Sequence, residues 1–557
     1  MKRSYCSTDG RVPKMQKDMV RASASDDDDQ DLRLIHDLRS SAADLFLREQ
    51  WSEALALYTR LIRLCQDQIP DDDLNDGRDS ERMAVFRRTL CIALSSRAET
   101  HSRSRDFGAA LEDCDRALGI DGSHFKTLMC KGRILLHHFS CYSAALDCFQ
   151  KASLDPQAAG AVDGLIKKCR KFEYLSRTGN FDLSDWVLNG FRGDCPQLAE
   201  YIGPVVVRKS DSCGRGLFAT RNIEAGTIVL VTRAVAVERG IAMCEEMDEN
   251  QQLVMWRRFV DKVVESASKC ATTRRQISAL LDGEESEVAL EAPDMSLFRM
   301  EPERRECSDG EVDAGKILSI LDMNSLVENA NSAKVLGTNK NCHGIGLWIL
   351  PSFVNHSCCP NARRTHVGNH LIMHASRDIK AGEELLFAYF DVKNPFEKRR
   401  EMSVSWGFRC SCSRCKFEES LCRELRDMME EMGVGSEGVD AGKVVFRLEE
   451  CMRKFAVRGR EKGYLRASFW GAYSETYTRE GLFKRWGRRI PTAEAIAESV
   501  AEAVGGDERV LRVVTRNCGG GGGGGASGMD GVLKLGRGIY GKIVKKKQAL
   551  KTLLDDI

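Results

Sequence analysis

Three cysteines stand close together in the second half of the chain, where Cys410, Cys412 and Cys415 form the pattern CxCxxC. Structural zinc binds four ligands in a tetrahedron, and cysteine thiolates are among its preferred ligands. The spacing places three thiolates on one short loop, so a fourth ligand must come from another part of the chain. A redox pair or a set of free thiols is the alternative. The pattern indicates a structural zinc site.

Three further motifs precede these cysteines in a fixed order. The first is a glycine-rich turn at residues 214–218 (GRGLF), and the second is the tetrapeptide NHSC at residues 355–358. The third is GEEL at residues 382–385, with Tyr389 four residues beyond it. Glycines in a turn let backbone groups approach a ligand closely, because no Cβ intervenes. Each motif alone is weak evidence, but the order and spacing of all of them are hard to obtain by chance.

Together with the segment FRCSCSRC at residues 408–415, these motifs resemble the SET-domain family. The chain is most similar to the SMYD-like branch, in which a helical insertion splits the SET domain and a zinc-binding tail follows at once. The resemblance covers about residues 203–391 and the tail to Cys415, with the insertion unmatched in detail. It implies a protein-lysine methyltransferase that uses S-adenosylmethionine and acts on a histone or a non-histone protein.

The resemblance also implies which residues hold the cofactor. In the family an asparagine just before the NHSC strand contacts it, and this chain offers Asn339 and Asn341, of which we favour Asn339. Phe408 matches an aromatic residue that packs on the adenine, although taken alone it reads as a core aromatic. The whole set expected to bind the cofactor is Cys213, Gly214, Arg215, Gly216, Asn339, Asn355, His356, Tyr389 and Phe408.

Tyr389 is the expected catalytic residue. Methyl transfer to lysine is an in-line displacement that needs a neutral amine aimed at the methyl group, and alignment can be worth ~7–11 kcal/mol. A tyrosine hydroxyl can orient the amine and stabilise developing charge. Because an ordinary tyrosine pKa lies near about 10, the hydroxyl is a poor base at neutral pH, so deprotonation is its second role. A strand tyrosine in the core is the alternative.

The fourth zinc ligand of the family corresponds to Cys358, which would link the metal to the cofactor-binding strand. The adjacent Cys359 should point elsewhere if the chain is extended there, because side chains alternate along a strand. Glu383 and Glu384 are expected to be structural and to hold a knot-like crossing around residues 355–358.

The insertion departs from the SMYD pattern. SMYD proteins carry a MYND zinc finger there, which needs many cysteines and histidines. Residues 237–315 contain only Cys244, Cys270 and Cys307, and no histidine. We therefore expect no finger, and the closer match is a MYND-less group, known in plants and fungi, that has N-terminal tetratricopeptide (TPR) repeats.

A helical repeat precedes the SET-like part. Bulky and small residues recur with one spacing in three segments, which begin at Trp51, Phe107 and Tyr142, and the last two begin 35 residues apart. This interval is close to the TPR period of about 34 residues. Ala42 and Ala98 stand where a small residue lets two helices approach closely. The pattern predicts a three-repeat array, whose groove would bind a protein partner or recruit the substrate, with chaperone-tail binding or a generic helical bundle as alternatives.

The expected fold class is α+β multidomain, with an N-terminal helical array, a central β-rich SET domain and a helical C-terminal region. The glycine run near residue 520 lacks the Lys-Ser/Thr of a phosphate-binding loop and is expected to be a linker. The predicted boundaries are 1–30 disordered, 31–178 TPR array with a capping helix, 179–202 linker, 203–392 SET domain with an insertion at 237–315, 393–418 zinc-binding segment, and 419–557 helical region with a glycine linker at 517–528.

Composition limits the function classes. The net charge of +1 gives no expectation of direct nucleic-acid binding. Most of the 22 cysteines are scattered singly, which is typical of reduced thiols rather than a secreted disulfide framework. The N-terminus lacks the apolar core of a signal peptide, and no apolar run reaches the ~20 residues of a membrane span. We expect a protein of the nucleus or cytoplasm that does not bind membranes. A TPR adaptor with an inactive SET domain is the alternative to an enzyme.

Overall fold

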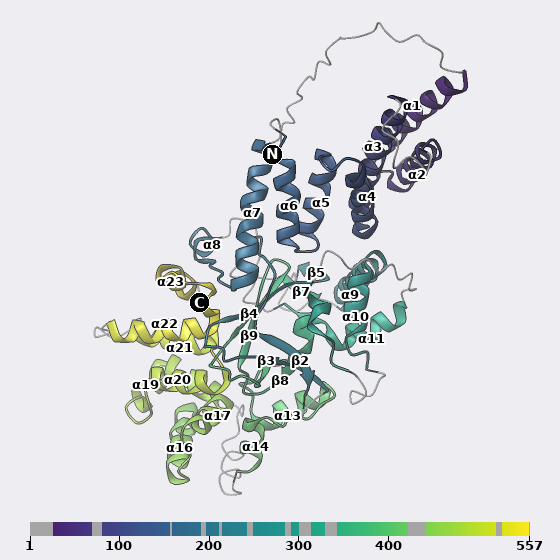
Figure 1. Cartoon of the computed structure of the whole chain (residues 1–557). Coiled ribbons are helices and arrows are strands. Elements are labelled where there is room, and N and C mark those ends of the chain that lie inside the picture. The colour runs from purple at the N-terminus through teal and green to yellow at the C-terminus, as the bar shows by residue number, and fades with distance from the viewer. Residues whose placement is uncertain are drawn as a thin grey trace. The chain divides into compact units, whose positions relative to one another are not determined.

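The structure is a computed structural model of the whole chain (Figure 1). By its internal contacts the chain divides into two units, Met1–Cys130 and Lys131–Ile557. The residues that the structure describes are 26–69, 81–155, 159–190, 196–210, 214–241, 249–283, 291–299, 313–328, 342–421, 440–519 and 526–555.

The first unit consists of helices that pack in chain order. Ala42 and Ala98 are fully buried in its helices, where the sequence places small residues for close helix approach. Arg97 and Asp113 form a two-point ion pair, with both N···O distances at 2.7 Å, that joins the third helix to the fourth. The TPR assignment of these helices stays a prediction. The helices are α1 (Asp26–Leu47), α2 (Trp51–Asp67), α3 (Glu81–Arg103) and α4 (Phe107–Ile120).

The second unit begins within a helix and continues into a short helical stretch. Gly132 in this stretch faces Phe149, and a Cβ at position 132 would lie 2.6 Å from the Phe149 ring. The glycine therefore allows the two helices to touch, as a small residue does in a helical hairpin. The helices are α5 (Phe125–His137, which crosses the boundary of the units), α6 (Tyr142–Ala152), α7 (Ala159–Thr178) and α8 (Ser184–Leu188).

Short β-branched segments then build the described sheets of the second unit. Their orders are β1-β4-β10-β9, β2-β3-β11-β8 and β5-β7-β6. The strands are β1 (Tyr201–Ile202), β2 (Val205–Lys209), β3 (Arg215–Ala219), β4 (Ile228–Arg233), β5 (Ala236–Ile241), β6 (Leu326–Val327), β7 (Cys342–Leu347), β8 (Asn355–His356), β9 (Ala362–Val367), β10 (His370–Ala375) and β11 (Glu384–Phe387).

The helical insertion begins later than the sequence suggests. Residues 237–241 belong to β5, which pairs with β7 in antiparallel register, so the first inserted helix starts at Glu249. Phe259 of that helix is buried in the same core as Trp348 and the sheet residues. Of the three insertion cysteines, Cys244 and Cys307 lie outside the described residues. The inserted helices are α9 (Glu249–Lys269), α10 (Ala271–Ser278), η1 (Met295–Phe298) and α11 (Ala314–Asn324), and η2 (Leu350–Phe353) follows β7.

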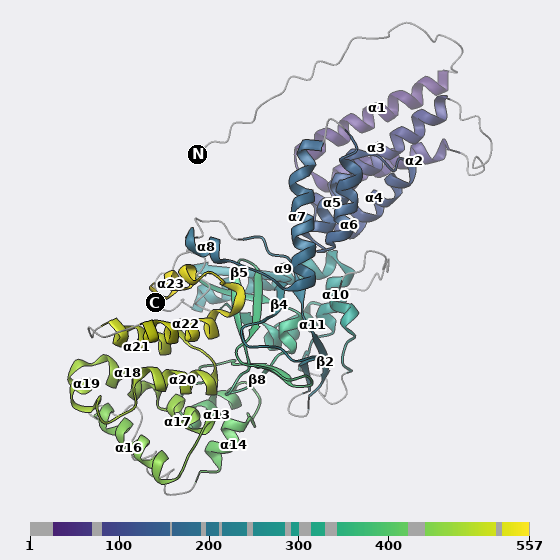
Figure 2. The ribbon, with the colours of Figure 1, turned by 60° about the vertical axis from the view of Figure 1, so that its left-hand side comes forward.

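The C-terminal helices gather on one side of the sheets (Figures 1 and 2). The segment around Lys542 returns to the turn that precedes β4, because Lys542 N–H donates to the Gly226 carbonyl at 2.7 Å. No helix in the described ranges combines the length and apolarity that crossing a membrane requires. The helices are α13 (Phe396–Ser405), α14 (Ser413–Glu419), α16 (Ala441–Lys454), α17 (Arg460–Ser468), α18 (Trp470–Thr478), α19 (Glu480–Trp486), α20 (Ala493–Val504), α21 (Glu508–Gly519), α22 (Ala526–Tyr540), η3 (Gly541–Ile543) and α23 (Lys547–Asp555).

Candidate functional site

A chain crossing positions Tyr389. Strand β8 lies parallel to β11, with Asn355 opposite Leu386 and His356 opposite Phe387. The Asn361 side chain closes the crossing, since its Oδ1 accepts from the Leu386 N–H at 2.8 Å and its Nδ2 donates to the Glu384 carbonyl at 2.8 Å. The motifs near residues 355 and 385 are thereby brought together two residues before Tyr389.

The two glutamates of the GEEL motif serve this crossing. The Glu383 carboxylate accepts from Asn361 Nδ2 at 3.2 Å and pairs with Arg377 at 2.5 Å. Burial acts to raise the pKa of Glu383, but the hydrogen bonds from Arg377, Lys380 and Asn361 and the charge of Arg377 together outweigh burial and lower the pKa. Glu384 accepts from Asn355 Nδ2 at 2.8 Å. Both side chains hold the crossing, as the sequence predicts.

The Tyr389 hydroxyl is fixed in direction. It donates to the Val354 carbonyl at 3.0 Å, and the Tyr389 backbone N–H donates to His356 Nδ1 at 3.0 Å. Because its proton is engaged, the phenol oxygen can meet a further group only as an acceptor. The arrangement suits an oxygen that receives the N–H of an amine and the partial positive charge of a transferring group.

Aromatic rings surround Tyr389. The ring centroids of His356, Phe387 and Phe408 lie 5.4, 5.5 and 6.0 Å from that of Tyr389. Trp406, which the sequence motifs do not include, lies 5.3 Å away and is half exposed. Aromatic walls favour a long aliphatic side chain that carries a polar end. Trp406 stands two residues before Phe408 at the end of α13. This closeness to Phe408 is the one signal in the sequence by which Trp406 could have been assigned to the site.

The glycine turn has a more structural role than expected. Gly214 has φ of 48°, a conformation that glycine adopts without strain. At Gly216 a Cβ would lie 2.2 Å from Glu384 Oε1, so glycine is required there by the glutamate that supports the crossing.

The side chains of Arg215 and Asn355 are engaged by other parts of the protein. The Arg215 guanidinium donates to the Ala279 carbonyl at 2.8 Å and stacks over Phe353, so it holds the insertion. Asn355 Nδ2 donates to the Arg215 carbonyl at 3.0 Å as well as to Glu384, which uses both of its amide protons. Of the other residues predicted to bind the cofactor, Cys213 and Asn339, like the alternative Asn341, lie outside the described residues.

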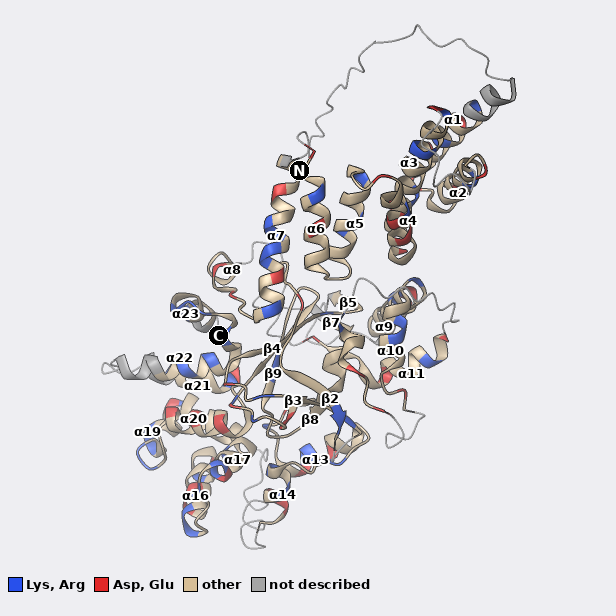
Figure 3. Cartoon of the chain, viewed as in Figure 1, with Lys and Arg blue, Asp and Glu red and all other residues tan. Residues whose placement is uncertain are grey.

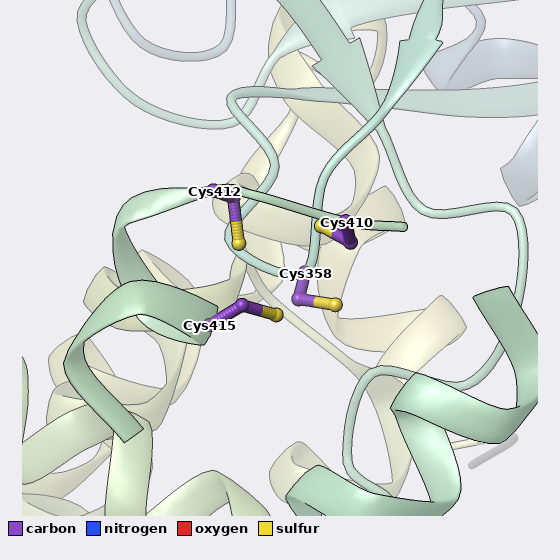
Figure 4. Close-up of side chains that lie close together, drawn as sticks. All are labelled: Cys358, Cys410, Cys412 and Cys415. Atoms are coloured by element: carbon purple, nitrogen blue, oxygen red, sulfur yellow. The ribbon is translucent and has the colours of Figure 1, made fainter. Parts of the chain in front are cut away.

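Four cysteine side chains converge beside this site (Figure 4). The sulfur atoms of Cys358, Cys410, Cys412 and Cys415 all lie within 4.8 Å of one another. A tetrahedral zinc with Zn–S bonds of ~2.3 Å separates its sulfurs by about 3.8 Å, so the spacing fits the ion. The hydrogen bond with Cys358 is the largest of the effects that raise the pKa of the Cys415 thiol. Without a cation, therefore, the four thiols do not all ionise.

Cys359 takes no part in the cluster. Its sulfur lies 3.5 Å from Ser357 Oγ and 3.3 Å from Ser413 Oγ. The chain bends at these positions and is not extended. A turn, and not strand alternation, therefore separates Cys359 from the group of four, and its thiol still meets Cys412: that hydrogen bond is the largest of the effects that raise the pKa of Cys359.

Buried charge around the cysteines also fits a tetrathiolate metal. Arg399 and Arg414 are buried, and both bind the single buried carboxylate of Glu418. Burial acts to lower the pKa of Arg399, but the negative charges of Glu418, Cys358 and Cys415 together outweigh burial and raise it. One guanidinium charge remains unmatched, and Arg399 Nη1 donates to Cys415 Sγ at 3.4 Å. Zinc with four thiolates carries a net charge of about −2, which this surplus would offset.

His356 connects the cysteine cluster to the tyrosine. Its Nε2 lies 3.4 Å from Cys358 Sγ, while its Nδ1 accepts from the Tyr389 backbone. Its ring also stacks on Phe390 at 4.3 Å and lies 5.3 Å from Phe408. A neutral imidazole that carries its proton on Nε2 satisfies both hydrogen bonds. Cysteines held in fixed positions would therefore also hold His356 and, through it, the backbone of Tyr389 in place.

A cavity of about 590 Å³ opens beside Tyr389. Its walls come from β9, from the segment around Tyr389, and from the C-terminal segment that enters α21. Arg509 of α21 binds Asp391 at 2.8 and 3.0 Å and ties the two walls together. Burial acts to raise the pKa of Asp391, but the hydrogen bonds and positive charges of Arg509 and Lys393 together lower it to about 2. The cavity can admit a polypeptide segment to the tyrosine.

Comparison with known proteins identifies part of the chain. The SET domain profile matches residues 214–390. A Gibberella zeae protein named "Methyltransferase" is 23% identical over 403 residues, which cover 68% of this chain and 51% of that protein. "Histone-lysine N-methyltransferase set5" of Schizosaccharomyces pombe is 38% identical over 86 residues, 15% of this chain and 27% of that protein.

Two further similarities are more limited. Human "Histone-lysine N-methyltransferase SMYD3" is 40% identical over 77 residues, 14% of this chain and 18% of that protein. A solved structure of Rubisco LSMT bound to sinefungin and monomethyllysine covers 63% of this chain and 83% of its own, at 13% identity and a TM-score of 0.20, which is too low to establish a shared fold. The chain spans about half the length, or less, of these three curated relatives. Residues 214–390 are a SET domain, homologous to those of SET5- and SMYD-type lysine methyltransferases.

Proposed function

We propose that this protein is an S-adenosylmethionine-dependent protein-lysine N-methyltransferase. The observation that carries the proposal is Tyr389, whose hydroxyl is held by Val354, whose ring is surrounded by aromatic side chains, and which lines a cavity. Relatives that are 38% and 40% identical over 86 and 77 residues are named histone-lysine methyltransferases. A histone or a non-histone protein is the substrate.

The residues of the chain have separate tasks in this reaction. S-adenosylmethionine supplies an electrophilic methyl group, and the residues placed to hold it are Gly214, the main chains of Arg215 and Asn355, His356 and Phe408. Tyr389 accepts a hydrogen bond from the neutral amine and aligns its lone pair, while Trp406 and Phe387 wall the aliphatic stem. The phenol oxygen also stabilises the positive charge that develops on nitrogen.

Zinc held by Cys358, Cys410, Cys412 and Cys415 would act structurally. Thiolates fill all four positions of the tetrahedron, which leaves no open position for catalysis. These cysteines belong to the segment that carries Phe408 and Trp406 and to the strand region that carries His356, so a bound metal would hold the two together. The N-terminal helices, as a TPR array, recruit the substrate or a partner protein.

Purified zinc-loaded protein tests the proposal when it is incubated with methyl-labelled S-adenosylmethionine and a proteome array. Label on lysine, together with calorimetric binding of S-adenosylmethionine, supports an enzyme. Absence of both binding and label, in a protein that melts cooperatively, contradicts the proposal and favours an adaptor that retains the SET fold as a scaffold.

A further inference from the structure

Two cavities lie along helix α21. The first, of about 590 Å³, is the one whose wall includes Tyr389 itself. The second, of about 430 Å³, lies between α18 and α21 and includes Arg516. Arg509 and Arg512 line both cavities, so we refer to the two together as the α21 cavities. A segment that leaves Tyr389 along α21 would pass over these side chains.

Carboxylates in the walls of the α21 cavities are satisfied within the protein. Asp391 binds Arg509, and Asp507 binds Lys393 and, at 3.2 Å, Arg509. Glu508 accepts from the Tyr540 hydroxyl at 3.0 Å. In the second cavity Glu475 pairs with Arg479 at 2.8 Å. These carboxylates are therefore not free to hold a basic ligand.

The remaining arginines in the walls of the α21 cavities differ from the carboxylates in their pairing. Within the described residues, the guanidinium groups of Arg363, Arg364, Arg512 and Arg516 form no ion pair with a carboxylate. Arg364 Nη1 and Arg512 Nε are buried and have no hydrogen-bond partner in the described part of the chain. A buried donor without a partner is costly, and a charged one more so.

Arg364 lines the first of the α21 cavities, as Tyr389 does. Its guanidinium lies over the Phe387 ring, 4.8 Å from the centroid. Burial lowers the pKa of Arg364 to about 10, so the group is still a cation at neutral pH. An incoming carboxylate could turn this guanidinium toward itself without breaking a hydrogen bond of its Nη1.

We propose that the α21 cavities bind an acidic segment of the protein substrate, so that the enzyme selects lysines flanked by Asp or Glu. This inference rests on the proposed function and narrows its substrate class. Arginine and carboxylate match in two-point geometry, and such pairs raise both affinity and orientation specificity. A segment rich in Lys or Arg would bring more positive charge to unpaired guanidinium groups and would be rejected.

A peptide suits these walls better than a nucleic acid does. Asp391, Asp507 and Glu508 stand among the arginines, and a continuous phosphodiester backbone would have to pass them. Side chains of a peptide can place carboxylates at the arginines and uncharged groups at the acids. Lys and Arg also alternate with Asp and Glu along the helices of the second unit (Figure 3).

Kinetics on three peptides test the inference with full-length zinc-loaded protein. Each peptide carries a single lysine, flanked by Glu and Asp, by Gln and Asn, or by Arg. We expect kcat/KM to be about tenfold higher for the acidic than for the neutral peptide, the scale of one charge-assisted hydrogen bond, and lowest for the basic one. The preference should weaken as salt concentration rises.

Variants with reversed charge test which residues cause the preference for the acidic peptide. The double variant Arg512→Glu, Arg516→Glu should lose the acidic preference and favour the basic peptide. The control Lys484→Glu, on the exposed face of α19 and outside both cavities, should keep the wild-type order. A wild type without charge preference, or a double variant that keeps the preference, overturns the inference.

Binding separates this inference from the proposed function. Fluorescence anisotropy with a labelled acidic peptide should give tighter binding than with the basic peptide, whether or not methyl transfer occurs. Equal methylation of all three peptides leaves the proposed function standing and defeats the inference. Tight, Arg512-dependent binding of the acidic peptide without any methyl transfer supports the inference and contradicts the proposed function. Stronger binding of single-stranded DNA, which displaces the peptide, would make the cavities a nucleic-acid site and contradict the inference.

Discussion

At the scale of single residues, the direction of one hydroxyl limits what Tyr389 can do. Because it donates to the Val354 carbonyl at 3.0 Å, it meets a substrate amine as an acceptor and not as a donor. Short local patterns in the sequence mark the tyrosine and three of the cysteines, and the family resemblance adds Cys358 as the fourth. They do not predict Trp406, or the side-chain role of Arg215 in holding the insertion, because the partners of these residues lie in other segments.

Glu418 carries a large share of the stability near the metal. It is buried and is the carboxylate that both Arg399 and Arg414 bind, so Glu418→Gln leaves two buried guanidinium groups without a counter-charge. We expect the loss to be about 3–5 kcal/mol. Exposed Glu419 on the same helix pairs with Arg409, and Glu419→Gln should cost less than about 1 kcal/mol. Urea denaturation of both variants measures this, and equal midpoints would contradict the assignment.

At the scale of elements, the parallel contact of β8 with β11 positions the site. The sequence predicts a crossing here from the family resemblance, and the hydrogen bonds of Asn361, Glu383 and Glu384 supply its physical basis. The start of the insertion is predicted too early, because residues 237–241 extend a strand whose partner lies about a hundred residues later. Such long-range pairing leaves little trace in a local pattern.

Gly216 tests the crossing directly. Since a Cβ there would lie 2.2 Å from Glu384 Oε1, Gly216→Ala must displace the glutamate from Asn355. We expect a loss of about 1–3 kcal/mol in stability, together with weaker methyl transfer. Gly481→Ala, where no atom lies within 4 Å of the added carbon, is the matched control and should leave the melting temperature unchanged or slightly higher. Similar melting temperatures for the two variants would argue against the role of Gly216.

Metal content tests the cysteine assignment. Mass spectrometry of the metals in purified protein should find one zinc per chain in the wild type and much less in Cys358→Ser. Cys359→Ser is the matched control, because the Cys359 sulfur faces Ser357 and Ser413 and lies outside the cluster. This control should keep its zinc. Loss of zinc from the Cys359 variant with retention in the Cys358 variant would reverse the assignment.

At the scale of the whole molecule, helices far along the chain complete the site of the SET strands. Arg509 reaches Asp391 across 118 residues, and α21 forms one wall of the cavity beside Tyr389. The sequence places a helical C-terminal region after residue 419, but no motif connects α21 with the tyrosine. The contact between α21 and the region of Tyr389 depends on how amphipathic helices pack in the folded protein. An amphipathic pattern shows that a helix has an apolar face, but it does not identify the surface against which that face packs.

The N-terminal helices belong to substrate choice in the proposed function. Deletion of residues 1–121 removes α1 to α4 and leaves α5 whole. We expect kcat/KM on a short peptide to be unchanged and methylation of an intact protein substrate to fall, because only the latter can use a recruiting surface. Calorimetric binding of S-adenosylmethionine serves as the folding control. An equal loss on peptide and protein would show that these helices act on catalysis itself.

The most direct measurement of the central claim compares methyl transfer by the wild type and by Tyr389→Phe, with S-adenosylmethionine binding measured on the same samples. Removal of the hydroxyl should leave binding nearly intact and lower kcat by about a hundredfold or more, since one preorganised polar group is lost from the transition state. Tyr174→Phe, at an exposed tyrosine, should match the wild type in both measurements. Equal rates for Tyr389→Phe and the wild type would contradict the account of Tyr389 as the catalytic residue of a protein-lysine methyltransferase.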